Sequence, residues 1–191
     1  MQIAYNKTAR KEKIKYIVIH DTGNKSKGAD AMAHFNYFNT GDRRSSADVF
    51  CDEKESLVVN DYNKYYTWHS GDGKGKRGIT NSNSVGVEIC VNSDGDYDKA
   101  VKNAILAVRK LMNELEIPET RVVRHFDASG KLCPASMSKD SWKAWNEFKK
   151  ALSDDALIVK ISAGLEDRTI DYLRSYTYGD ALIKKLADAS I

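Results

Sequence analysis

Two runs of apolar and β-branched residues predict the central strands of this chain. The first covers residues 15–20 and ends at a polar segment from Asp21 to Asn24. The second covers residues 84–91 and is interrupted only by Gly86 and Glu88. Short apolar runs that are bounded by turn residues are typical of buried strands. Weaker strand patterns lie at residues 46–52, 57–60 and 121–125.

Three segments have the spacing of amphipathic helices. The strongest is residues 98–115, where an apolar stripe runs from Val101 to Leu115 and Pro118 follows. Residues 28–38 and 140–152 show the same period, with aromatic side chains on the apolar face. Because strands alternate with helices, the pattern predicts an α/β fold (α+β in some schemes) with a central mixed β-sheet flanked by helices.

The pattern changes after Leu152. Residues 155–160 and 180–185 form a near-repeat, and two short copies are too few for a solenoid. A segment of this size buries little core alone. We therefore expect a main domain over residues 1–152 and a short, mainly helical C-terminal appendage over residues 153–191. The appendage is expected to pack on the main domain, on a second copy of the chain or on a ligand.

Composition narrows the class of protein. A length of 191 residues, with 41% hydrophobic and 30% charged residues, is typical of one globular domain with a small addition. The net charge of +3 comes without a basic stripe interleaved with aromatic residues, so we expect no nucleic-acid partner. Three cysteines, an odd number, argue against a disulfide framework.

The chain shows no targeting or membrane pattern. No apolar run approaches the roughly 20 residues of a membrane span, so we expect no membrane insertion. The first residues lack the apolar core of a secretory signal. These patterns predict a cytoplasmic location.

Two histidines and a cysteine form the strongest candidate site. His20 ends the first predicted strand, and His125 and Cys133 lie eight residues apart in a later predicted loop. Together they supply three ligands of the kinds that zinc prefers, and they leave a fourth tetrahedral position for water. This arrangement is typical of catalytic zinc sites, so the pattern favours a hydrolase over a binding module.

Taken singly, these residues have simpler explanations. A histidine at the end of a strand is usually only hydrogen-bonded there. A lone cysteine is usually a small buried apolar residue, as we expect for Cys51 and Cys90. A glutamate such as Glu88 usually faces solvent, and a loop lysine such as Lys131 is usually solvated.

Four segments in a fixed order strengthen the zinc interpretation. They are residues 17–22 (IVIHDT), 68–71 (WHSG), 83–89 (NSVGVEI) and 124–134 (RHFDASGKLCP). Across residues 14–152 the chain resembles the zinc-dependent N-acetylmuramoyl-L-alanine amidases of the phage lysozyme and peptidoglycan-recognition-protein type. The resemblance implies hydrolysis of the amide between N-acetylmuramic acid and the L-alanine of the stem peptide, with bacterial peptidoglycan as the partner.

The resemblance also implies roles for individual residues. The zinc ligands fall on His20, His125 and Cys133. The catalytic carboxylate falls on Glu88, which would move a proton from water to the leaving nitrogen, and Lys131 would stabilise the oxyanion. Residues expected at the substrate groove are His69, Trp68 and Thr22.

One departure from the family concerns residues 46–50. Many members carry a histidine or tyrosine there, and in some phage enzymes the tyrosine assists catalysis, whereas this chain has Ala47 and Asp48. Because this aromatic contribution is absent, the departure strengthens the expectation that Glu88 is the catalytic residue.

Three biological roles are compatible with these patterns. The resemblance favours a phage or prophage endolysin, which stays cytoplasmic until a membrane pore releases it to the cell wall. Residues 153–191 would then be a cell-wall-targeting module or a homo-oligomer contact. The alternatives are a non-catalytic peptidoglycan-binding protein and a host autolysin or recycling amidase. Cys133 argues against a binder, because binders of this type lack the cysteine, and against a recycling amidase, because recycling enzymes tend to have aspartate there. A host autolysin stays open, and neighbouring genes such as that of a holin would separate it from an endolysin.

Overall fold

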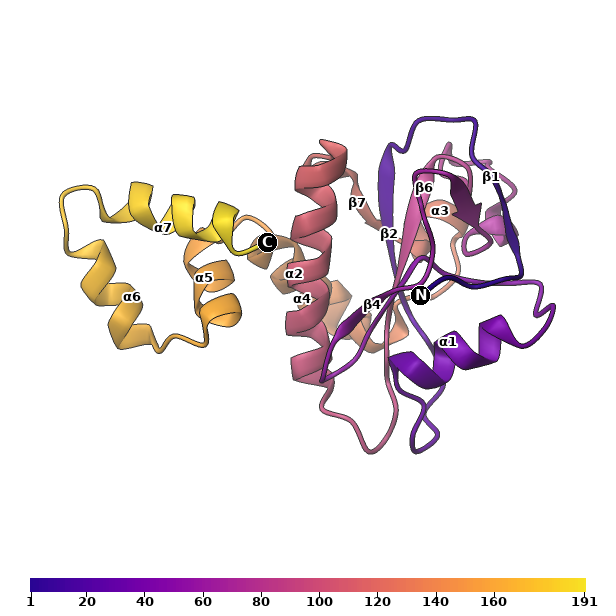
Figure 1. The fold of residues 1–191 in the computed structure, drawn as a ribbon, viewed down its shortest axis with the longest axis horizontal. Coiled ribbons are helices and arrows are strands. Elements are labelled where there is room, and N and C mark those ends of the chain that lie inside the picture. Colours follow the sequence, from indigo (N-terminus) through magenta and orange to yellow (C-terminus); the bar gives the residue numbers. More distant parts are fainter.

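A five-stranded sheet in the order β4-β3-β6-β2-β7 lies at the centre of the fold (Figure 1). The computed structural model covers residues 1–191 and describes every side chain except that of Asp72. Strands β2, β3, β6 and β7 pair in parallel, and β4 pairs antiparallel to β3. The predicted mixed sheet is therefore confirmed. Its strands are β2 (Tyr16–Asp21), β3 (Val49–Cys51), β4 (Ser56–Val58), β6 (Ser84–Ile89) and β7 (Val122–Arg124).

Helices cover both faces of this sheet (Figure 1). Ile17 and Ile19 face the core that α2 (Tyr97–Leu115) and α4 (Lys139–Ala151) close. Val18 points to the opposite face, toward α3 (His125–Ser129). Because side chains alternate along a strand, His20 also belongs to this second face. Helix α1 (Ala31–Asn39) packs there against β3 and β4.

Several boundaries differ from the sequence-based expectation. The helix expected from residue 28 begins at Ala31, because Gly28 has a φ of +73° and the Asp30 side chain accepts a hydrogen bond from the Ala33 N–H. The small antiparallel sheet of β1 (Lys7–Ala9) and β5 (Tyr65–Thr67) was not expected. The short 3-10 helices are η1 (Gly71–Gly73), η2 (Glu119–Arg121) and η3 (Ala135–Met137).

The C-terminal appendage is helical, as predicted. It consists of α5 (Asp155–Ala163), α6 (Asp167–Arg174) and α7 (Gly179–Ala189), on the side of α2 away from the sheet (Figure 1). The Asp154 side chain caps α5 by accepting a hydrogen bond from the Leu157 N–H. The buried residues of the appendage, among them Ile158, belong to the same hydrophobic cluster as the main core. No helix in the described part of the chain is long and apolar enough to cross a membrane.

Arg109 connects α2 to this appendage. Its guanidinium donates hydrogen bonds to the Leu152 carbonyl and to Asp155 Oδ1, the latter at 2.7 Å. A second carboxylate, that of Asp188 on α7, lies 3.7 Å away. The Arg109 side chain is only 11% exposed, so its contacts with Leu152 and Asp155 are partly shielded from water, whereas Asp188 is 45% exposed.

We expect Arg109→Met to lower the free energy of unfolding by about 1.5–3 kcal/mol, the usual range for hydrogen bonds to charged groups. Methionine keeps the apolar packing of the stem but leaves the Leu152 carbonyl and Asp155 without this donor. Urea denaturation followed by circular dichroism measures the change. The control is Lys110→Met, whose side chain is 58% exposed and lies 4.0 Å from Glu114, so it should cost under about 0.5 kcal/mol. Equal costs for the two variants would contradict the anchoring role.

Candidate metal centre

The register of the two central strands places His20 beside Glu88. In the parallel β2–β6 pair, His20 is opposite Glu88 and Ile19 is opposite Val87. Both side chains therefore emerge from the same face, near the carboxyl ends of their strands. Glu88 Oε1 lies 4.0 Å from His20 Nδ1. Strand β2 thus presents the His20 imidazole, and the neighbouring strand β6 presents the Glu88 carboxylate.

The segment from His125 to Cys133 folds back on itself. His125 is the first residue of α3 rather than a loop residue, which corrects the sequence-based expectation. The helix ends at Gly130, with a φ of +88°, which glycine adopts without steric cost. The Phe126 N–H then donates to the Cys133 carbonyl at 3.0 Å. This hydrogen bond brings the cysteine back to the histidine.

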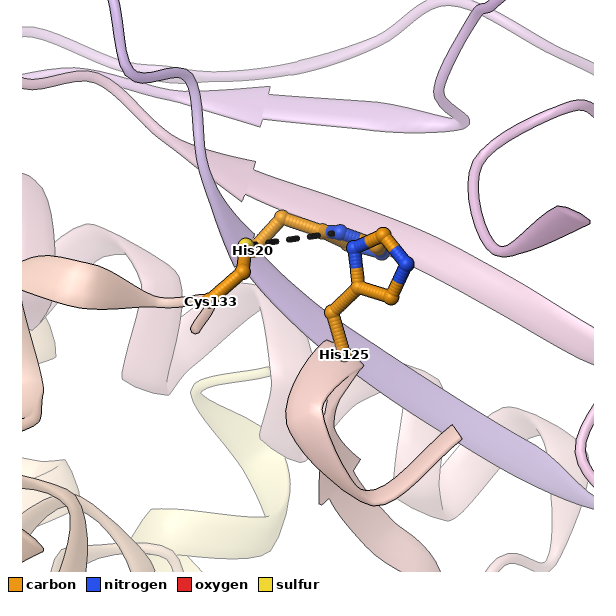
Figure 2. A group of neighbouring side chains, drawn as sticks. All are labelled: His20, His125 and Cys133. Carbon is orange, nitrogen blue, oxygen red and sulfur yellow. Dashed lines mark hydrogen bonds between the residues drawn. The ribbon is translucent and has the colours of Figure 1, made fainter. Parts of the chain in front are cut away.

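His20, His125 and Cys133 converge on one point (Figure 2). One nitrogen or sulfur atom from each residue lies within 4.8 Å of the corresponding atoms of the other two. Cys133 Sγ is 3.8 Å from His20 Nδ1, and the two imidazole centroids are 4.5 Å apart. All three side chains are buried. The three residues expected as metal ligands are thus brought together by β2, α3 and the segment that follows α3.

His69 lies directly behind His20. Its Nδ1 is 3.1 Å from His20 Nε2, and its Nε2 is 3.2 Å from Ser84 Oγ. The imidazole of His69 is buried, although the residue also borders the groove described below. The expected substrate residue therefore makes its closest side-chain contact with a candidate ligand.

Burial determines the protonation of the imidazoles. It lowers the pKa of His20 well below the usual value, and the neighbouring His69, His125 and Lys131 lower it further. The pKa of His69 falls to about 3, mainly through burial. Neutral imidazoles carry a lone pair, which metal coordination requires.

Burial has the opposite effect on the two acidic groups. It raises the pKa of the Cys133 thiol to about 12, and the nearby Glu88 carboxylate adds to this rise. It also raises the pKa of Glu88 to about 8, with a further contribution from Asp21. A bound cation would favour both deprotonated forms, because it would add positive charge to that of Lys131, which already lowers both pKa values.

Glu88 has an unused oxygen in this site. Its Oε2 is buried and has no hydrogen-bond partner among the described residues, and the same holds for Thr22 Oγ1. Buried polar atoms are nearly always hydrogen-bonded to protein or to ordered water. These two oxygens are therefore buried acceptors that no described residue satisfies.

A groove of about 470 Å³ opens beside the candidate ligands. The groove is bordered by one candidate ligand, His125, and by three other residues expected at the site: Trp68, His69 and Lys131. Thr22 borders a different hollow of about 480 Å³, between the end of β2 and α1. The structure therefore separates Thr22 from this groove. His20, Glu88 and Cys133 are not among the residues that line the groove either.

The buried carboxylate of Asp48 was not anticipated as a structural element. It accepts hydrogen bonds from Asn60 Nδ2, Thr67 Oγ1 and the Gly86 N–H, at 2.7–2.8 Å. It thereby ties β5 to β6 beneath His69. The only sequence signal was the departure from the family at this position, and burial of a polar group at the end of a strand has no distinctive pattern.

Comparison with known proteins agrees with this geometry. A family model described as N-acetylmuramoyl-L-alanine amidase matches residues 10–136. The amidase CwlH of Bacillus subtilis (strain 168) is 38% identical over 141 residues, which cover 72% of this chain and 52% of CwlH. XlyA of the same strain is 38% identical over 140 residues, covering 72% of this chain and 43% of XlyA. The chain thus spans about half the length of these curated relatives.

Solved structures agree with the sequence comparison. The catalytic domain of XlyA superimposes with a TM-score of 0.68 and 35% identity, over 78% of this chain and 92% of that domain. A mutant endolysin from Bacillus subtilis superimposes with a TM-score of 0.70 and 37% identity, over 80% of this chain and 96% of the endolysin chain. This chain belongs to the N-acetylmuramoyl-L-alanine amidase family.

Proposed function

We propose that this protein hydrolyses the amide bond between the lactyl group of N-acetylmuramic acid and the L-alanine of the peptidoglycan stem peptide. The observation that carries the proposal is the convergence of His20, His125 and Cys133 on one point, where His125 also borders an open groove. The relatives that share this fold are named for the same activity.

The ligands fit a zinc ion. Two neutral imidazoles and one thiol are the donor types that zinc prefers, and catalytic zinc sites have three protein ligands. The distances among the three donor atoms, at most 4.8 Å, allow one ion to contact all of them. When bound there, zinc would polarise the scissile carbonyl and lower the pKa of a water molecule.

Glu88 is proposed as the proton carrier. Its unpartnered Oε2 accepts a proton from the attacking water, and the resulting carboxylic acid then protonates the departing alanine nitrogen. A pKa raised by burial suits this role, because the group must both take and release a proton near neutral pH.

Lys131 is proposed to stabilise the oxyanion. It borders the groove with His125, and its ammonium can donate hydrogen bonds to the oxygen that gains negative charge. The positive charge of Lys131 also lowers the pKa values of His20, Glu88 and Cys133, which supports this role.

Trp68 is proposed as a substrate contact. Its side chain is 39% exposed at the groove, and its indole N–H donates to Thr8 Oγ1 at 3.1 Å, which fixes the orientation of the ring. An oriented aromatic face can pack against the apolar side of a sugar or peptide.

We expect Trp68→Ala to raise the KM for soluble muropeptide about tenfold with a smaller change in kcat. Loss of about 1.4 kcal/mol of contact to both ground and transition states corresponds to this factor. Steady-state kinetics measures it, and Trp68→Phe, which keeps a ring, should restore most of the affinity. An unchanged KM in Trp68→Ala would remove Trp68 from the substrate site.

The biological role proposed is that of an endolysin, with residues 1–152 as the catalytic domain. Residues 153–191 are proposed as a cell-wall-targeting or dimerisation module. Large apolar side chains that the appendage exposes to solvent support a role in binding the cell wall or a second copy of the chain. They are Tyr172, Tyr176, Tyr178, Leu182 and Leu186.

Digestion of purified Gram-positive cell walls tests the proposed function. We expect the zinc-loaded protein to release new amino termini of L-alanine without new reducing sugar ends. Removal of the metal with a chelator should stop the release, and added zinc should restore it. A zinc-loaded protein that sediments with walls but releases nothing would be a binding protein instead.

A further inference from the structure

His69, Ser84 and Thr80 form a chain of hydrogen bonds behind the candidate ligand His20. The chain runs from His20 Nε2 to His69 Nδ1 at 3.1 Å, and from His69 Nε2 to Ser84 Oγ at 3.2 Å. It ends where Ser84 Oγ donates to the Thr80 carbonyl. None of these contacts is required for the proton transfer assigned to Glu88.

The last member of the chain determines the direction of every hydrogen bond in it. A carbonyl oxygen can only accept, so the single Ser84 hydroxyl proton is used on Thr80. Ser84 Oγ must then accept from His69 Nε2–H. A neutral imidazole has one protonated nitrogen, so His69 Nδ1 carries a lone pair and accepts from His20 Nε2–H.

This direction leaves the other nitrogen of His20 unprotonated. His20 Nδ1 is the atom that faces Cys133 Sγ at 3.8 Å and Glu88 Oε1 at 4.0 Å. We propose that His69 is a positioning residue, which holds His20 in the tautomer whose Nδ1 lone pair points at the metal position. The inference rests on the proposed zinc site and adds how the first ligand is prepared for the ion.

The surroundings hold His69 in place for this role. The His69 N–H donates to Asn81 Oδ1 at 2.9 Å, which orients the backbone. The imidazole lies against Gly86, where a Cβ atom would come within 2.6 Å of His69 Cγ. Glycine is therefore required at position 86 for the ring to occupy this site.

The far end of the chain is equally constrained. Thr80 N–H donates to Asn83 Oδ1 at 2.9 Å, which closes the turn that presents the Thr80 carbonyl. Arg10, which follows β1 and is distant in sequence, donates through Nη2 to the Ser84 carbonyl at 2.9 Å. One hydrogen bond thus holds the turn that carries the Thr80 carbonyl, and another holds the backbone of Ser84.

Metal affinity of two matched variants tests the inference. His69→Leu removes the acceptor at similar volume, and His69→Asn returns an amide oxygen close to the position of Nδ1. We expect His69→Leu to bind zinc 10–100-fold more weakly than the wild type, the usual effect of losing an outer-shell partner, and His69→Asn to recover most of the affinity. Competition with a chromophoric chelator gives the zinc affinities, and the absorption spectrum of the cobalt-loaded proteins reports the ligand geometry.

Two outcomes would overturn the inference. One is wild-type affinity and an unchanged cobalt spectrum in a folded His69→Leu variant, and the other is equal weakening in His69→Leu and His69→Asn. Because His69→Leu could fail to fold, the tautomer is also measured in the wild type by long-range proton–nitrogen NMR. We expect a protonated Nε2 and an unprotonated Nδ1 in His69, and the reverse assignment would contradict the proposal.

The same experiments separate this inference from the proposed function. If the wild-type protein does not bind zinc, both the proposed metal site and the positioning role of His69 are wrong. A wild-type protein that binds zinc and cleaves walls, but has the reverse tautomer at His69, would remove only the positioning role.

Discussion

Cys133→Ser is expected to abolish both zinc binding and cell-wall hydrolysis. The Cys133 sulfur is one of three donor atoms within 4.8 Å of one another, and as a thiolate it would be the only one of them to supply negative charge to the ion. A serine hydroxyl does not ionise near neutral pH, so the variant keeps two neutral imidazoles alone. We expect zinc affinity to fall by more than the 10–100-fold that outer-shell partners cause.

The fold should survive this change. Cys133 is buried, but serine is close to it in volume, and the segment is also held by the Phe126 N–H to Cys133 carbonyl bond. The matched control is Cys90→Ser, a second buried thiol whose Sγ lies 4.0 Å from His34 Nδ1 and outside the cluster. Metal content by mass spectrometry and wall turbidity should distinguish the two variants. Full activity in a zinc-free Cys133→Ser protein would exclude the metal mechanism.

Glu88→Gln is expected to retain zinc and to lose 10²–10⁴-fold in kcat, the range that general acid–base groups supply. Glutamine has nearly the same shape as glutamate but cannot accept the proton of the attacking water. Burial already disfavours the charged form of this carboxyl, so the neutral amide should be tolerated by the fold.

The control for Glu88→Gln is Glu147→Gln, an exposed position on α4. It should change neither zinc content nor kcat. If Glu88→Gln bound zinc normally and kept at least a third of wild-type kcat, another group would have to move the proton. If it lost zinc, Glu88 would instead be needed for the metal site.

The strongly periodic segments could be predicted from sequence. Residues 15–20 correspond to Tyr16–Asp21, because a short apolar run bounded by turn residues is typical of a strand that is buried on both faces. Residues 98–115 correspond to Tyr97–Leu115, because their apolar side chains repeat with the period of a helix. The β1–β5 pair was missed, since its register joins Lys7 to Thr67 and each strand is three residues long. Pairing at such separation leaves no local pattern.

The candidate site could be predicted from sequence only in part. Family motifs pointed to His20, His125 and Cys133, and the fold brings them together. The chain from His20 to the Thr80 carbonyl depends on the side-chain directions of residues that are adjacent only after folding.

Mass spectrometry of one purified soluble muropeptide, incubated with the zinc-loaded protein, tests the central claim most directly. The account predicts two products that together equal the substrate plus one water: a sugar whose lactyl group ends in a free carboxylate, and a stem peptide that begins with a free L-alanine amine. Intact lactyl–alanine amide, whether with cleaved glycosidic bonds or with no cleavage, would contradict it.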